Sequence, residues 1–250
     1  LENQADQTDA HWVLNRIAGV YEDGLNEVDG ALDAYRQIIR DKPDDKAALE
    51  DIERLLAQEQ RWPELVDQLC HRRTLTDDPT QWIPWELRRA ELLENMVLDG
   101  PQAFAIYREI IESDHENEPA AQAIKQLFHE RERARSIGLE PHELVDILEP
   151  IVRRNNDTDS LILILEVRQE TSAEESEERA GYLGELAEIY SDKHGAAAST
   201  FDAYSRLFQL NASAQTARSF RDVARDLGRM DEFVVFLEQQ IAEIDDQETR

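Results

Sequence analysis

The chain has 250 residues, of which 41% are hydrophobic and 33% are charged, and its formal net charge is −28. This apolar content is too high for a disordered chain, and the length allows one or two ordinary cores or one elongated stack. The acid excess repels phosphate groups and no basic patch offsets it, which argues against nucleic acids and anionic membrane surfaces as partners. No apolar run approaches membrane-spanning length, so we expect no membrane insertion.

Two features of the composition bear on the environment of the chain. Only 4 of the 27 basic residues are lysine. Acid excess with lysine depletion resembles the surfaces of proteins from salty habitats, so the charge reflects either the solvent or a basic partner. Cys70 is the only cysteine, which leaves no intramolecular disulfide, and its register with Leu65, Val66 and Leu69 predicts a buried thiol. The chain starts without Met or a signal peptide, which indicates a fragment or a processed chain and favours the cytoplasm.

Helical periodicity runs through the whole chain and predicts about 13 helices. Apolar positions at helical spacing span residues 14–21, 31–39, 48–56, 62–69, 82–98, 103–111, 124–128, 144–151, 161–167, 183–190, 204–208, 220–227 and 233–244. A polar turn is expected from Glu22 to Gly30, and Asp99 is the expected N-cap of the sixth helix, with Pro101 in its first turn. The run Leu161–Val167 also fits a buried strand.

The regular alternation of helices weakens near the middle of the chain. The seventh helix fades into the charged run from Glu130 to Arg135, and Gly138 to Pro141 ends it. We therefore expect a joint near 131–140 that divides 1–130 from 141–250.

One helix pair occurs three times with the same spacing. The separation in sequence between Ala18 and Tyr35 is identical to that between Ala90 and Tyr107, and to that between Ala187 and Tyr204. The match extends further along the chain, because the apolar pattern after Arg61 is repeated after Arg229. A four-helix unit of about 70 residues, made of two helix pairs, is therefore reused.

The spacing of the first copy resembles the tetratricopeptide repeat. Ala31, Tyr35, Ile38 and Pro43 match its second helix, and Ile17-Ala18-x-x-Tyr21 matches its first. The later copies depart from the pattern at Leu93, His115, Thr200 and Ala212. The resemblance covers most of 12–245. It implies an all-α solenoid of antiparallel helix pairs over 1–250, wound as a right-handed superhelix, that is a non-enzymatic scaffold for protein partners.

In tetratricopeptide-like stacks the first helix of each pair lines the concave face, which implies a groove here. The residues expected on it are Arg16, Glu22, Arg88, Glu91, Glu94, Glu185 and Glu188. Acids outnumber bases, so the groove favours an extended basic segment of a protein or peptide partner. Trp82 and Trp85 flank a proline and would serve as anchors if exposed, the alternative being that they pack against the preceding helix pair.

No motif predicts catalysis, a cofactor or a metal. His142-Glu143-x-x-Asp146 lacks the second His of a zinc-protease motif. The segment from Asn155 to Glu166 has calcium-loop spacing but Ser160 where such loops need Gly, and we interpret it as a turn in which Asp159 or Ser160 caps the next helix. Two alternatives to a partner-binding scaffold stay open: self-assembly through the open ends of the stack, and a helical domain that serves an enzyme in a longer chain.

Overall fold

The computed structural model describes residues 2–173, 176–192 and 197–248, with side chains from residue 10 to residue 242 within these ranges. Leu1 lies outside the described residues, and the predicted apolar position Ile244 lies outside the described side chains. The described parts contain helices and no strand, so the strand alternative for Leu161–Val167 is wrong.

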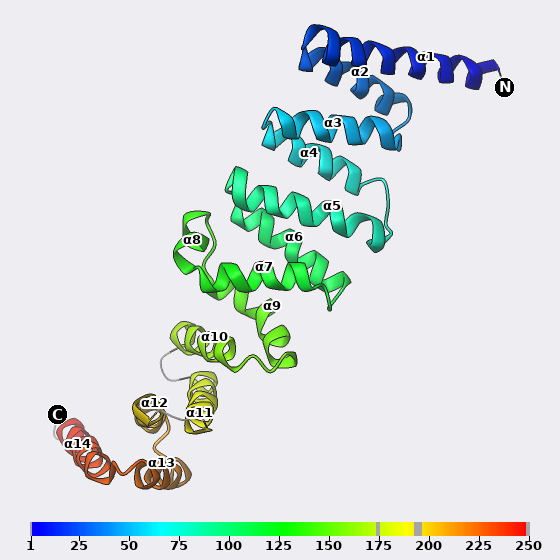
Figure 1. The fold of residues 1–250 in the computed structure, drawn as a ribbon. Helices are drawn as coiled ribbons and strands as arrows, with labels where there is room; N and C mark the ends of the chain where they lie inside the picture. Colours follow the sequence, from blue (N-terminus) through cyan, green and yellow to red (C-terminus); the bar gives the residue numbers. More distant parts are fainter. Residues whose placement is uncertain (1, 174–175, 193–196, 249–250) are drawn as a thin grey trace. The chain divides into compact units, whose positions relative to one another are not determined.

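The helices follow one another with short connections (Figure 1). In chain order they are α1 (Glu2–Gly19), η1 (a π-helix, Val20–Leu25), α2 (Val28–Asp41), α3 (Lys46–Gln58), α4 (Trp62–Arg73), α5 (Pro79–Leu92), η2 (a π-helix, Leu93–Val97), α6 (Gly100–Ser113), α7 (Glu118–His129), α8 (Arg131–Ser136), α9 (Pro141–Arg154), α10 (Thr158–Thr171), α11 (Glu177–Asp192), α12 (Ala197–Leu210), α13 (Ala214–Asp226) and α14 (Met230–Glu248).

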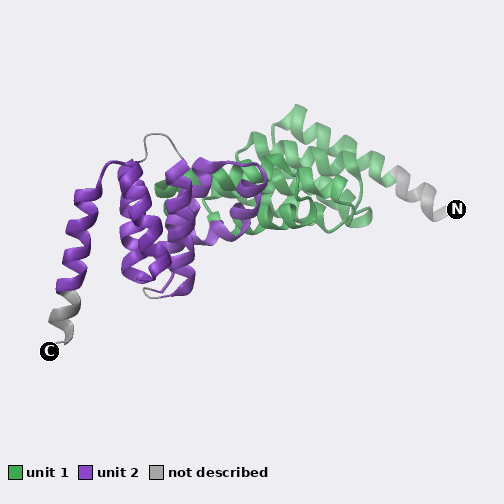
Figure 2. Cartoon of the chain, turned by 90° about the horizontal axis from the view of Figure 1, so that it is seen from below, with its two compact units in different colours: residues 1–140 green, residues 141–250 purple. Residues whose placement is uncertain are grey.

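The chain divides into two compact units, unit 1 from Leu1 to Glu140 and unit 2 from Pro141 to Arg250 (Figure 2). Within each unit, helices pack mainly against those that precede and follow them in the chain. Such nearest-neighbour packing is the defining property of helical repeat arrays. The right-handed superhelix and the single solenoid over 1–250 stay predictions.

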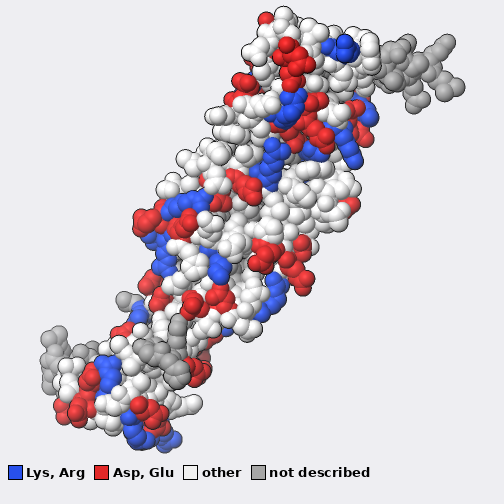
Figure 3. Space-filling view, in the orientation of Figure 1, with Lys and Arg blue, Asp and Glu red and all other residues white. Residues whose placement is uncertain are grey.

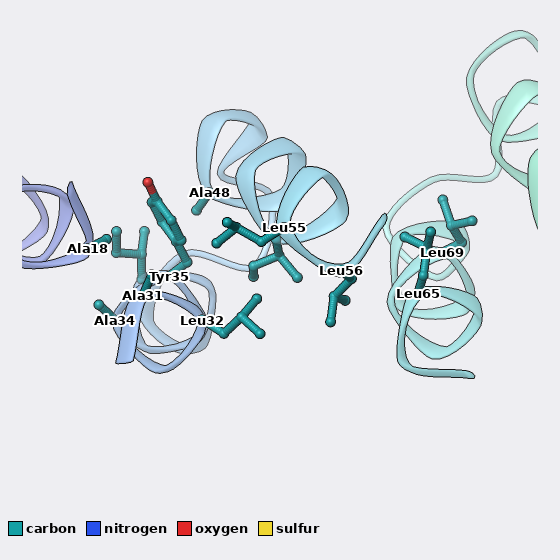
Figure 4. Close-up of a cluster of buried hydrophobic side chains, with 12 residues drawn as sticks. Ala18, Ala31, Leu32, Ala34, Tyr35, Ala48, Leu55, Leu56, Leu65 and Leu69 are labelled. Atoms are coloured by element: carbon teal, nitrogen blue, oxygen red, sulfur yellow. The ribbon is translucent and has the colours of Figure 1, made fainter. Parts of the chain in front are cut away.

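The repeated small and aromatic positions form the core, as predicted. Ala18 and Ala31 have no exposed surface and let α1 and α2 approach closely, while Tyr35 fills the space beside α3 (Figure 4). Tyr107 and Tyr204 occupy the same position in the later copies and are likewise buried.

The internal repeat extends to the helix caps. Asp45, Asn117 and Ser213 each begin the first helix after a repeated pair, and each side chain accepts a hydrogen bond from the backbone N–H three residues later, at 3.2, 3.2 and 3.1 Å. Asp99 caps α6 in the same way at 3.1 Å, as predicted. Each cap satisfies a donor that the helix leaves unpaired.

One predicted turn is more helical than expected. The first helix continues through the predicted turn as η1 and stops at Asn26, whose φ is 56°. The fifth helix was expected to reach Leu98, and α5 continues as η2 to that residue, whose φ is 63°. The predicted joint contains a short helix, α8, whose Ala134 is buried.

Two further expectations need correction. Cys70 is exposed, because it lies beyond the edge of the apolar stripe formed by Leu65 and Leu69 on α4. In the turn with calcium-loop spacing, Asp157 is the cap in place of Asp159 or Ser160, because its carboxylate accepts from Ser160 N–H at 3.1 Å. Within the described residues no three His, Cys, Asp or Glu side chains converge as metal ligands. No described helix combines the length and apolarity that a membrane crossing needs.

Candidate partner-binding pockets

Unit 1 contains a pocket of about 390 Å³ between α5 and α7, the first helices of two consecutive pairs. We name it the unit 1 pocket. Its lining includes Glu91, Glu94, Tyr107, Ala123, Gln126 and Arg133. Tyr107, from α6, lies at its base and is 1% exposed, and Glu91 on α5 is exposed at its wall.

Unit 2 contains a pocket of about 370 Å³ at the equivalent place, between α11, α12 and α13. We name it the unit 2 pocket. Glu188 and Tyr204 line it, and in the internal repeat they align with Glu91 and Tyr107. The internal repeat therefore builds the same pocket twice, with a glutamate above a buried tyrosine.

The first copy shows what such a site holds when its own chain fills it. Arg54, on α3, reaches back to η1 and donates from one guanidinium nitrogen to Glu22 and to Asp51, at 2.9 Å each. Hydrogen bonds to Glu22 and Asp51 raise the pKa of Arg54. Burial, followed by the charges of Asp51 and Glu22, raises the pKa of the Tyr35 hydroxyl below it. A guanidinium thus lies between carboxylates near the repeat tyrosine.

The later copies lack this arginine. When the copies are aligned on their repeated helices, Gln126 stands at the position of Arg54 in the second copy and Asp222 in the third. Neither side chain can supply a cation, although in the second copy Arg133 of α8 pairs with Glu94, the counterpart of Glu22. A pocket is present in each of these two copies.

The charges of the unit 1 pocket are only partly matched. Glu94 is 7% exposed, accepts from the Tyr107 hydroxyl at 3.0 Å and forms an ion pair with Arg133 of α8. Burial, followed by the charge of Glu94, raises the pKa of Tyr107. Glu91 adds to that effect, yet its carboxylate has no ion-pair partner among the described residues.

The unit 2 pocket is more acidic. Glu177 and Glu188 are the charged residues of its lining, and no Lys or Arg of the described chain joins them there. Burial, followed by the charge of Glu188, raises the pKa of Tyr204. Each pocket therefore carries at least one glutamate, Glu91 or Glu188, that has no ion-pair partner among the described residues.

The residues that the sequence suggested for the groove fall into different environments. Only Glu91, Glu94 and Glu188 line the two pockets, and Glu94 lies at the buried base rather than on the rim. The others are elsewhere: Glu22 is held by Arg54, Arg88 by Glu53 at 3.3 Å and Glu185 by Arg153 at 2.8 Å, while Arg16 is exposed on α1.

The tryptophan anchors are already occupied by the protein itself. Trp82 is 3% exposed, and the guanidinium of Arg73 lies 4.4 Å from the centre of its ring. Trp85 is half-buried beneath Arg72, at 4.3 Å. Both rings join α5 to α4, so Trp82 packs against the preceding helix pair, the alternative considered for it, and Trp85 offers only part of its ring.

Sequence reasoning did not identify the tyrosines as the base of a pocket, nor the role of Arg54. A comparison of the three copies position by position would have found part of the signal, because Arg54 is replaced by Gln126 and Asp222, and Gly19 by Glu91 and Glu188. On the face drawn in Figure 3, acidic and basic side chains lie interspersed, which shows why net charge alone does not locate the site.

No protein-family model matches the chain, and no curated protein matches it. Among solved structures, a tetratricopeptide repeat protein from Parabacteroides merdae ATCC 43184 is 12% identical with a TM-score of 0.37, over 94% of this chain and 80% of that one. BtubC (BKLC) from P. vanneervenii is 12% identical with a TM-score of 0.32, over 95% and 93%. MamA protein is 12% identical with a TM-score of 0.25, over 97% and 96%.

These TM-scores are low, and the assignment of the fold rests on the chain's own contacts. Helix pairs are reused with the same small and aromatic core positions, the same caps and packing between sequence neighbours. The chain is an all-α, tetratricopeptide-like array of helix pairs.

Proposed function

We propose that the chain is a protein-binding scaffold, and that basic side chains of an extended partner segment enter the unit 1 and unit 2 pockets. The observation that carries this proposal is the filled first copy, where the guanidinium of Arg54 lies between carboxylates near Tyr35. A partner's arginine or lysine would enter the later copies beside Glu91 and Glu188, which align with Gly19 of the first copy and have no ion-pair partner among the described residues.

The expected energetics follow from the setting of these glutamates. Each carboxylate lies at the wall of a pocket rather than on an open surface, so a cation that enters loses part of its water and is less screened than at a rim. Charged contacts across an interface affect partner specificity and the association rate more than the total affinity. The remaining affinity would come from apolar and backbone contacts along the first helices.

The proposal is tested with a fluorescein-labelled peptide of repeated Gly-Ser-Arg and the double variant Glu91→Lys with Glu188→Lys. We expect this variant to bind the peptide about tenfold more weakly, about 1.4 kcal/mol, because each pocket then carries a like charge. Its thermal melting curve followed by circular dichroism should be unchanged, since both side chains are exposed.

The matched control is Glu59→Lys with Glu170→Lys, two exposed acids outside both pockets, which changes the net charge by the same amount. The control should retain most of the binding. Equal losses in the two double variants would mean that the peptide responds only to the net charge, and equal binding by the wild type and the pocket variant would exclude the pockets as the binding site.

A further inference from the structure

The two terminal helices of the described chain each present an apolar face that no described element covers. On α1, Trp12 is 65% exposed, Val13 46% and Ile17 40%. On α14, Val234 is 48% exposed and Ile241 60%. Exposed apolar side chains gathered on one helix face mark an interaction surface.

The internal repeat identifies what such faces contact inside the chain. α1 corresponds to α5, because Ala18 aligns with Ala90, and α14 corresponds to α4, because Arg229 aligns with Arg61. Within unit 1, α4 and α5 pack directly against each other. On α5, one face packs against α4, and the outer face of α1 corresponds to that face. On α4, one face packs against α5, and the outer face of α14 corresponds to that face.

Individual residues support this correspondence. Val66 on α4 is 8% exposed, whereas its counterpart on α14, Val234, is 48% exposed. Trp85 on α5 is packed against the cluster that contains α4, whereas its counterpart on α1, Val13, is 46% exposed. At these two positions the side chain is more covered at the internal joint than at the ends, whereas Trp12 aligns with Pro84, which is exposed on α5 as well.

The polar pairs of the internal joint change together at the ends. At the joint, the guanidinium of Arg73 covers the ring of Trp82. The counterparts of these two residues are Ile241 on α14 and Ala10 on α1. The cation is thus replaced by an aliphatic side chain on one end face, and the aromatic ring by a small side chain on the other.

The buried ion pair on α5 changes in the same sense. Glu86 is 1% exposed and accepts from Arg89 at 2.7 Å. Their counterparts on α1 are Leu14, which packs against the core cluster of unit 1, and Ile17, which is exposed. At Ile17 the outer face of α1 therefore carries an aliphatic side chain where α5 carries Arg89.

We propose that the outer face of α14 in one copy of this chain binds the outer face of α1 in a second copy, in the manner of α4 on α5. The two faces differ from each other, so the contact is heterologous and leaves one free face of each kind on every assembly. Such a contact continues into longer assemblies as the protein concentration rises, unless the rotation closes a ring.

Sedimentation velocity on the full chain tests the proposal with two variants. The α1 variant carries Val13→Glu with Ile17→Glu, and the α14 variant carries Val234→Glu with Ile241→Glu. The wild type should show a weight-average mass that rises with concentration above 28.9 kDa. Each variant alone should stay at that mass, since every head-to-tail contact would include one altered face.

The mixture of the two variants is the decisive sample. The α1 variant still offers an intact α14 face, and the α14 variant an intact α1 face, so the mixture should reach twice 28.9 kDa and stop there. Met96→Glu, at an exposed apolar position on η2, is the matched control and should associate like the wild type. Unchanged circular dichroism melts establish that the variants fold.

Four results would overturn the proposal. A wild type that stays monomeric at all concentrations excludes a second copy as the occupant. Association of the α14 variant alone would indicate contacts between two α1 faces instead. A mixture that stays monomeric would show that the two faces do not match, and loss of association in the Met96→Glu control would show that the self-association is unspecific.

Discussion

Replacing Tyr107 by Phe removes one hydroxyl from the base of the unit 1 pocket and leaves the buried ring in place. That hydroxyl donates to Glu94 at 3.0 Å, and both residues are almost fully buried, at 1% and 7% exposed. Hydrogen bonds to charged groups contribute about 1.5–3 kcal/mol to stability. Because Glu94 keeps its ion pair with Arg133, we expect a loss at the lower end, about 1.5–2 kcal/mol.

The same substitution at the equivalent position of unit 2 is the matched control. Tyr204 is buried to a similar degree, at 8% exposed, and its hydroxyl has no hydrogen-bond partner among the described side chains. Tyr204→Phe should therefore change the free energy of unfolding by no more than about 0.5 kcal/mol. The difference between the two variants isolates the hydrogen bond, because the change in side-chain volume is the same.

Urea unfolding followed by tryptophan fluorescence measures the first variant selectively. All four tryptophans lie within residues 12–85, so their emission reports on unit 1, while circular dichroism reports on both units. A loss of about 1.5 kcal/mol should also lower the melting temperature by about 3–6 °C for a chain of this size. Equal losses in the two variants, or no loss for Tyr107→Phe, would refute the assignment of a buried, stabilising hydrogen bond to Glu94.

Two further predictions concern unit 1. Gly100→Ala should destabilise the chain by about 1–3 kcal/mol in urea unfolding, because a Cβ there would lie 2.6 Å from the backbone oxygen of Ile137. Gly19 has open space around it, so Gly19→Ala should be neutral or stabilising. Equal effects of the two substitutions would contradict the close contact at Gly100. Hydrogen bonding to Arg54 lowers the pKa of Glu22, so this carboxylate stabilises the fold above its ordinary pKa of 4.5, and the contribution is lost as the pH falls through the lowered folded-state value. The difference in unfolding free energy between the wild type and Glu22→Gln should therefore shrink on acidification, and a constant difference would exclude the linkage.

The fold was predictable where one residue type suits one position in every copy. Ala18 and Tyr35 recur at fixed spacing because close helix approach and a filled gap each demand a particular side-chain size, and the structure buries both. Helix ends were harder to predict. The extension of the first helix through η1 depends on a left-handed Asn26, a local choice that the polar composition of 22–30 does not distinguish from an ordinary turn.

Burial at the edge of a helix face was the other limit. Cys70 lies one helical turn after Val66, which is itself at the margin of the apolar stripe on α4. Because successive helical turns do not fully align, Cys70 is rotated beyond that margin and is exposed. Glu94 shows the opposite case. Its charge predicted an exposed rim position, but Arg133, which is distant in the sequence and belongs to α8, supplies the partner that makes burial tolerable.

The candidate pockets were predictable only in part. The pattern placed Glu91 and Glu188 on first helices, and the structure locates both in pockets. The tyrosine at the base and the neighbouring helix that closes each pocket depend on contacts between pairs, which spacing within one pair does not specify. The comparison with Arg54 needs both the internal alignment and the structure.

The most direct test of the central claim is a cycle that removes the charge on each side of the proposed contact separately. Fluorescence anisotropy would measure the binding of the Gly-Ser-Arg peptide, and of the same peptide with citrulline in place of arginine, to the wild type and to Glu91→Gln with Glu188→Gln. Citrulline keeps the shape of arginine and lacks its charge. We predict that citrulline weakens binding to the wild type by about tenfold, about 1.4 kcal/mol, and changes binding to the variant by less than about twofold. Equal losses in the two proteins would show that the arginine does not contact these glutamates and would contradict the account.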